Sequence, residues 1–208
     1  NYTVREAIMR VEAWYDNNVL NVIEMVSMQM LTESETDPVL KEVISSLDLA
    51  VIGEKGILQA AGVDTMQRIR ETEENDFSDE FLKRVERNRK SVFVIGETQE
   101  AVDELIQELS EEYPKLVLAG AAATENCVGD LEGVINELNA ATPAVIISII
   151  PSPKQEHFLV EHRDKINANL WYGIGGFEVH RKRSKIKGFF FNLIQRIRLK
   201  NSIEKYES

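Results

Sequence analysis

The residues best placed for chemistry are Lys154, Gln155 and Glu156, which follow an apolar segment and two prolines. Residues 144–150 are mostly β-branched and apolar, a pattern typical of a strand buried on both faces of a sheet. A helix is expected from Lys154 to about Arg163. Ligands of open α/β sheets bind at the carboxyl ends of the strands, and helix N-termini favour anions such as phosphate. The alternative is an ordinary strand–helix connection in which Gln155 and Glu156 are solvated.

Several other expected strands also end in turns, most of which contain glycine. We expect these turns to gather with 151–156 at one edge of a sheet; they are 53–56, 96–98, 120–127 and 173–178. Glycine permits close approach of the backbone to a ligand. No turn is a fingerprint by itself, because no helix clearly follows the glycines at 173–176. A G-x-x-x-x-G-K-[ST] loop is also missing, which argues against a Walker-type nucleotidase.

The elements that must position these turns alternate between strand and helix from about residue 19. The expected strands are 19–26, 48–52, 91–95, 116–119, 144–150 and 168–172. Such alternation with short connections predicts a mostly parallel open sheet with helices on both faces, a Rossmann-like α/β fold. A helix is expected to begin at Asp37-Pro38, with Asp37 as its cap and Pro38 in its first turn. The polar stretch 64–79 is expected to be a surface loop or a solvated helix face, and 81–88 is expected to be helical.

The composition bounds the cellular setting. Cys127 is the single cysteine, so an internal disulfide is excluded. Together with the lack of a secretory apolar segment, this favours a reducing, cytoplasmic setting. No apolar run reaches the length needed to span a bilayer, so we expect any membrane contact to be peripheral.

Charge divides the chain into an acidic domain, 1–180, and a basic appendage, 181–208. The appendage has nine Lys and Arg against two Glu, whereas the preceding residues have 15 against 33 Asp and Glu. Apolar residues at i, i+3, i+4 and i+7 from Phe190 predict an amphipathic helix. A basic helix of this kind suits an anionic membrane surface. The residues expected to contact the membrane are Arg181, Lys182, Arg183, Lys185, Lys187, Phe190, Arg196 and Arg198. The alternative is a helix packed on the domain.

Nucleic acid is a poorer partner for this chain, because the acidic domain would repel a long phosphate backbone. The sequence leaves the oligomeric state open, a homo-oligomer included.

Five segments in order resemble the WecG/TagA/CpsF glycosyltransferases, glycosyltransferase family 26. Residues 153–156 resemble the P-K-Q-E signature of that family, and 92–96 resemble its apolar strand ending in glycine. The remaining matches are 112–120 to its "yP-x-l…G" segment, 135–139 to its "I-n-x-x-n" helix, and 173–178 to its "GvGG-x-FD" segment. The resemblance runs from near the N-terminus to about residue 178.

The resemblance implies a parallel α/β fold and inverting transfer of an N-acetylhexosamine from a UDP-sugar. The implied acceptor is a polyprenyl-diphosphate-linked sugar, typically undecaprenyl, at the inner face of the cell membrane, in the synthesis of wall teichoic acid or a related surface polysaccharide. Gln155 and Glu156 would then line the donor site, and Lys154 could steady the departing diphosphate. The glycines that would let the backbone approach the nucleotide or sugar are Gly96, Gly120, Gly173, Gly175 and Gly176.

The chain departs from the family pattern where the catalytic base is expected. The family has T-x-N after an early strand, where this chain has residues 23–27, and it has Asp-Gly where this chain has Gly53-Glu54. Inverting transfer needs a carboxylate that takes a proton from the acceptor hydroxyl. Glu54 is our candidate for this base, with a one-residue offset. The alternative is an exposed turn glutamate in a catalytically inactive relative that binds a nucleotide-sugar or acts as a scaffold at the membrane.

No metal or other cofactor is expected. The sequence has no D-x-D motif and no cluster of His, Cys and Asp with metal-ligand spacing. Helix N-termini and lysines could stabilise the diphosphate in place of a metal.

Overall fold

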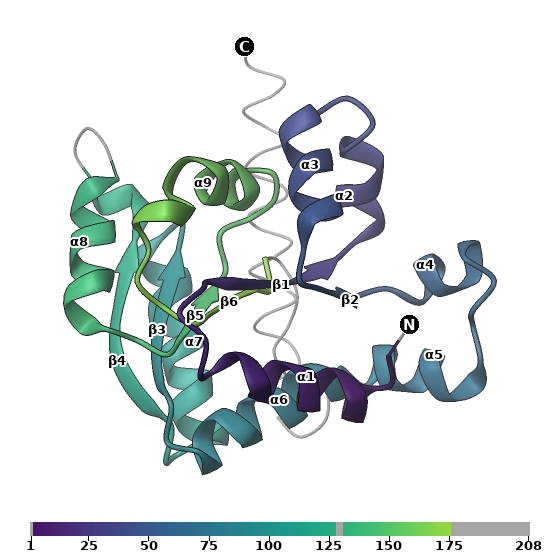
Figure 1. The fold of residues 1–208 in the computed structure, drawn as a ribbon, viewed down its shortest axis with the longest axis horizontal. Helices are drawn as coiled ribbons and strands as arrows, with labels where there is room; N and C mark the ends of the chain where they lie inside the picture. The colour runs from purple at the N-terminus through teal and green to yellow at the C-terminus, as the bar shows by residue number, and fades with distance from the viewer. Residues whose placement is uncertain (1, 128–130, 176–208) are drawn as a thin grey trace.

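A parallel six-stranded sheet organises the computed structural model, which describes residues 2–127 and 131–175 (Figure 1). The strands are β1 (Asn21–Val26), β2 (Leu49–Ile52), β3 (Ser91–Gly96), β4 (Val117–Ala123), β5 (Val145–Ser148) and β6 (Leu170–Gly173). Their order is β2-β1-β6-β5-β3-β4, and every pairing is parallel. The predicted open parallel sheet is therefore confirmed.

Helices cover both faces of the sheet (Figure 1). On one face lie α1 (Val4–Trp14), α6 (Asp76–Arg87) and α7 (Gln99–Glu112), and on the other lie α8 (Glu132–Ala141) and α9 (Lys154–His162). The remaining helices are α2 (Met28–Glu33), α3 (Pro38–Ser46), α4 (Lys55–Ala60) and α5 (Met66–Glu73), with short 3-10 turns η1 (Thr124–Asn126) and η2 (Arg163–Lys165). The fold thus has three layers around two apolar cores.

Alternation along the strands divides their side chains between these two cores. Val145 and Ile147 of β5 face α1, α6 and α7, whereas Ile146 faces α8 and α9. All four residues of β5 are buried, as are Val92–Gly96 of β3. A strand buried on both faces reads as a continuous apolar run, which is why these two strands were predictable.

Local capping explains where several helices begin. Thr3 and Glu6 form a reciprocal capping box at the start of α1. The side chain of Asp37 accepts from the backbone N–H groups of Val39 and Leu40, and Pro38 occupies the first turn of α3. The predicted start of α3 is confirmed.

Several predicted boundaries differ from the structure. In the polar stretch 64–79, α5 has no buried residue, as expected for a solvated helix face, whereas α6 begins at Asp76 instead of near Phe81. The two helices meet at Asn75, whose φ of 54° is left-handed. Strand β4 continues to Ala123 instead of ending near Gly120, with an irregularity in its pairing to β3. Strand β5 ends at Ser148, so Ile149 and Ile150 belong to the following turn.

Candidate functional site

The turns that follow the strands lie at the carboxyl edge of the sheet, because all six strands run in the same direction. Strands β3 and β5 are neighbours, yet the chain leaves β3 toward β4 on one side and β5 toward β6 on the other. Such a topological switch is where open α/β sheets bind ligands. The structure therefore places the described parts of the predicted turns at the edge where a ligand is expected.

A buried polar cluster lies at this edge, between β1 and the first turn of α9. The side-chain Nε2 of Gln155 donates to Oε1 of Glu24 at 3.2 Å. The exposed fractions of Glu24, Gln155 and Glu156 are 0%, 2% and 0%. The alternative prediction that Gln155 and Glu156 are solvated first-turn residues was therefore wrong.

Gly173 explains how Gln155 comes so close to the sheet. Gly173 pairs with Glu24 on one side and Ser148 on the other. A Cβ added at Gly173 would lie 2.8 Å from Cδ of Gln155 and closer still to its Nε2. The Gln155 amide thus lies directly over the Gly173 backbone, which brings the segments 153–156 and 173–175 together.

Burial makes the two carboxyl groups of the cluster hard to ionise. Burial, with a smaller contribution from the Glu156 carboxyl, raises the pKa of Glu24 to about 9, although the Gln155 hydrogen bond opposes this shift. Burial also raises the pKa of Glu156. Glu24 is therefore a neutral acid at pH 7 and is not available as a general base there.

An ion pair and a His–Asp contact join the segments around this cluster. Lys154 pairs with Glu97, which connects the turns after β5 and β3 at the topological switch. His157 Nε2 lies 2.9 Å from Oδ2 of Asp37, which holds α9 to the start of α3. The Lys154 side chain is 65% exposed. A surface pair of this kind contributes little to stability, so an incoming anion could replace Glu97 at small cost.

Glu54 lies at the same edge, in the turn after β2. Its Oε1 accepts from the backbone N–H of Met28 at 3.4 Å, which connects the ends of β2 and β1. The residue is half-buried. Glu54, the predicted catalytic base, is thus partly accessible to solvent at the carboxyl edge, whereas Glu156 is fully buried.

The lack of a side chain at Gly96 and Gly120 serves close packing. A Cβ at Gly96 would lie 2.7 Å from Cγ2 of Val102 and 3.0 Å from Cγ1 of Ile149. A Cβ at Gly120 would lie 2.8 Å from Cε2 of Phe93. Their predicted contact with a nucleotide or sugar stays a prediction.

The remaining predicted residues divide into two groups. Gly175 has a φ of 53°, a left-handed conformation that glycine adopts without strain, and lies beside the carbonyl of Ile150. Gly176 lies outside the described residues, together with the residues expected to contact the membrane, Arg181, Lys182, Arg183, Lys185, Lys187, Phe190, Arg196 and Arg198.

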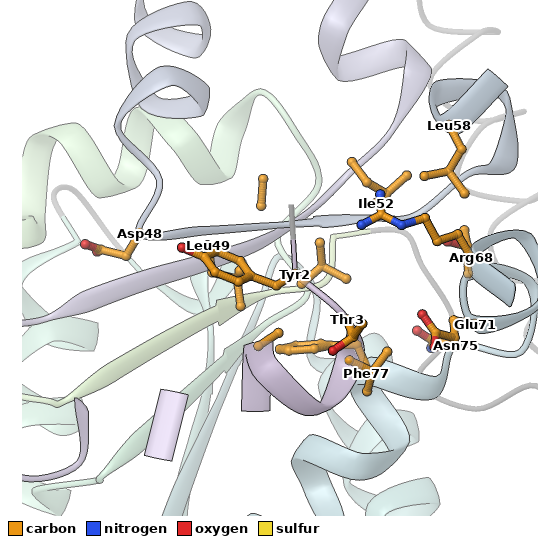
Figure 2. Close-up of a pocket in the computed structure, with 15 residues that line it drawn as sticks. Tyr2, Thr3, Asp48, Leu49, Ile52, Leu58, Arg68, Glu71, Asn75 and Phe77 are labelled. Carbon is orange, nitrogen blue, oxygen red and sulfur yellow. The ribbon is translucent and has the colours of Figure 1, made fainter. Parts of the chain in front are cut away.

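A cavity of about 360 Å³ lies beside the edge strand β2 (Figure 2). Its lining combines the whole of β2 with Tyr2, Thr3, Arg68 and Phe77, among others. Within the part of the chain that the structure describes, none of the predicted site residues lines it. The cavity is therefore separate from the polar cluster at the carboxyl edge.

The described part of the chain has neither a group of side chains suited to a metal ion nor a helix suited to spanning a membrane. Within residues 2–127 and 131–175, no three His, Cys, Asp or Glu side chains are grouped so that they could hold a metal ion. No helix of these ranges is both long and apolar enough to cross a membrane.

Replacing Gly173 by Ala is expected to lower the free energy of unfolding by about 1–3 kcal/mol, because the added methyl group overlaps the Gln155 amide. Urea unfolding measures the change. Gly133→Ala is the matched control, since a Cβ there meets nothing within 4 Å and the residue lies in α8. Equal unfolding midpoints for Gly173→Ala and wild type would contradict the packing described here.

Sequence reasoning missed Glu24 as a member of the cluster. The available signal was a lone acidic residue between apolar neighbours, in the run from Val22 to Val26. A charged residue type is almost never fully buried without a partner. Its position between apolar residues of a predicted strand was therefore a signal for a polar partner.

The chain is similar in sequence to known glycosyltransferases. A family model described as "Glycosyl transferase WecG/TagA/CpsF family" matches residues 1–180. A Staphylococcus aureus protein named N-acetylglucosaminyldiphosphoundecaprenol N-acetyl-beta-D-mannosaminyltransferase is 22% identical over 181 residues, which cover 85% of this chain and 69% of the relative. A Bacillus spizizenii protein with the same name is 24% identical over 189 residues, 88% of this chain and 72% of the relative.

Proposed function

We propose that this chain, which belongs to the WecG/TagA/CpsF family of glycosyltransferases, transfers an N-acetylhexosamine from a UDP-sugar to a polyprenyl-diphosphate-linked sugar. The observation that carries the proposal is the contact of Gln155 with Gly173, which brings two family segments together at the carboxyl edge. The names of the two relatives support this choice of acceptor and of transferred sugar.

In the proposed reaction, Glu54 takes the proton from the acceptor hydroxyl. The hydroxyl oxygen attacks the anomeric carbon of the donor sugar while the bond to the UDP oxygen breaks, which inverts the configuration. Lys154 leaves Glu97 and neutralises the departing diphosphate, assisted by the N-terminus of α9. The reaction as written needs no metal ion. The basic residues of 181–208 would hold the enzyme at the anionic membrane that contains its acceptor.

Release of UDP tests the proposal. The full chain would be incubated with UDP-N-acetylmannosamine or UDP-N-acetylglucosamine and a short-chain N-acetylglucosaminyl diphospholipid. We expect UDP to form only when donor and acceptor are both present, and the lipid product to gain one N-acetylhexosamine by mass. Lack of UDP above the acceptor-free control with either donor would contradict the proposal.

A second candidate is a relative that binds UDP-sugar without turnover. The burial of Gln155 and Glu156 favours it, as does Gly53 at the place where the family pattern has an aspartate. This candidate predicts UDP binding with no release of UDP from the donor. Binding and turnover measured on the same preparation therefore separate the two functions.

A further inference from the structure

We infer that Glu24 is a positioning residue for the donor: it orients the Gln155 amide so that Oε1 accepts from an amide N–H of the nucleotide-sugar. That N–H belongs either to the acetamido group of the sugar or to the uracil ring. The inference deepens the proposed function and rests on it, because the ligand is the proposed donor.

The position of Glu24 is fixed by the sheet. It lies in β1 between β2 and β6, where it pairs with Ala50 on one side and Gly173 on the other. Alternation along β1 directs its side chain to the same face as Val22, the face that α9 covers. The carboxyl group is therefore held by a strand that is paired on both sides, and not by a surface loop.

Two contacts restrict the Gln155 amide. Its flat side lies against the Gly173 backbone, and its Nε2 donates to Glu24. Nε2 of Gln155 donates to the carbonyl oxygen Oε1 of the neutral Glu24 carboxyl, and this contact leaves Oε1 of Gln155 outside that bond. Because Glu24 is neutral at pH 7, the contact does not require a buried charge.

Within the described chain, the side-chain oxygen Oε1 of Gln155 lacks a partner that a ligand could supply. Oε1 of Gln155 is buried and has no hydrogen-bond partner among the described residues. A buried acceptor without a partner is destabilising unless a partner arrives. An acceptor selects a ligand N–H or O–H and does not suit a phosphate oxygen. Gln155 therefore fits the hydrogen-bond donors of the nucleotide-sugar, among them its two amide N–H groups, whereas Lys154 fits its diphosphate.

Three variants of the full chain test the inference. Glu24→Met keeps the approximate size but removes the acceptor, Glu24→Gln keeps an acceptor oxygen, and Ile23→Val is a control on the opposite face of the same strand. Calorimetric titration measures affinity for UDP and for UDP-N-acetylglucosamine. Proton–nitrogen NMR spectra report solvent exchange of the Gln155 side-chain NH₂, identified by its loss in Gln155→Met.

We expect Glu24→Met to weaken binding of UDP-N-acetylglucosamine about tenfold or more and to speed exchange of the NH₂ protons, with Glu24→Gln and Ile23→Val within about threefold of wild type. A matching loss for UDP places the partner of Gln155 in the nucleotide, and a loss confined to the UDP-sugar places it in the sugar. Wild-type affinity for both ligands in Glu24→Met would overturn the inference, as would equal losses in Glu24→Gln. If the wild-type chain binds neither ligand, the proposed donor site is wrong. That result needs no variant, so it is distinguishable from failure of the inference about Glu24.

Discussion

Replacing Glu54 by Gln is expected to lower kcat for sugar transfer by about 10²-fold or more, while affinity for UDP stays within about threefold of wild type. Gln has nearly the same shape and keeps an oxygen that can accept from the Met28 N–H. It cannot take a proton from the acceptor hydroxyl. Initial rates of UDP release measure kcat, and calorimetric titration with UDP measures the affinity.

Glu125→Gln is the matched control for Glu54→Gln. Glu125 also lies at the carboxyl edge, in η1 after β4, where its Oε1 accepts from the Gln99 N–H at 2.6 Å. Gln at this position keeps an accepting oxygen, so we expect turnover within about threefold of wild type. If Glu54→Gln retains as much turnover as Glu125→Gln, Glu54 is not the base.

The stability of wild type is expected to fall, relative to Glu24→Gln, as pH rises from about 5 to 9. The pKa of Glu24 is raised from 4.5 to about 9 in the folded chain, so over this range the unfolded chain binds fewer protons. The stability contributed by the neutral acid is complete below pH 4.5 and is lost as pH rises toward 9. One proton gives a slope of at most about 1.4 kcal/mol per pH unit.

Urea unfolding of both proteins at several pH values between 5.5 and 8.5 measures this slope. The difference between the two curves cancels titration of groups that do not contact Glu24. Glu156 does interact with Glu24, so Glu156→Gln is measured as a second reference. Parallel curves for wild type and Glu24→Gln would show that Glu24 is already ionised in the folded chain.

The sheet was predictable because its central strands are buried on both faces. Residues 91–95 and 144–150 read as continuous apolar runs for that reason. The cap at Asp37 was equally predictable, since a short acidic side chain before proline is a common helix start. Strand order and register depend on contacts between segments far apart in the chain, and no local pattern contains them.

The site was less predictable, because polar and charged residues that are usually exposed are buried there. Gln155 and Glu156 belong to a residue class that is mostly solvated in a first turn, yet Gly173 lets that turn approach the sheet. Glu24 interrupts an apolar strand, and its partner lies 131 residues away. The burial of Gln155 and that of Glu24 both depend on the contact between β1, β6 and α9. This contact can be inferred only when the strand order is known.

The location of bound UDP is the most direct test of the carboxyl edge as the donor site. In a crystal structure of the full chain with UDP, we expect the diphosphate at Lys154 and the first turn of α9, with the nucleoside over the ends of β5 and β6. UDP in the cavity beside β2 (Figure 2), with the carboxyl edge empty, would contradict this assignment.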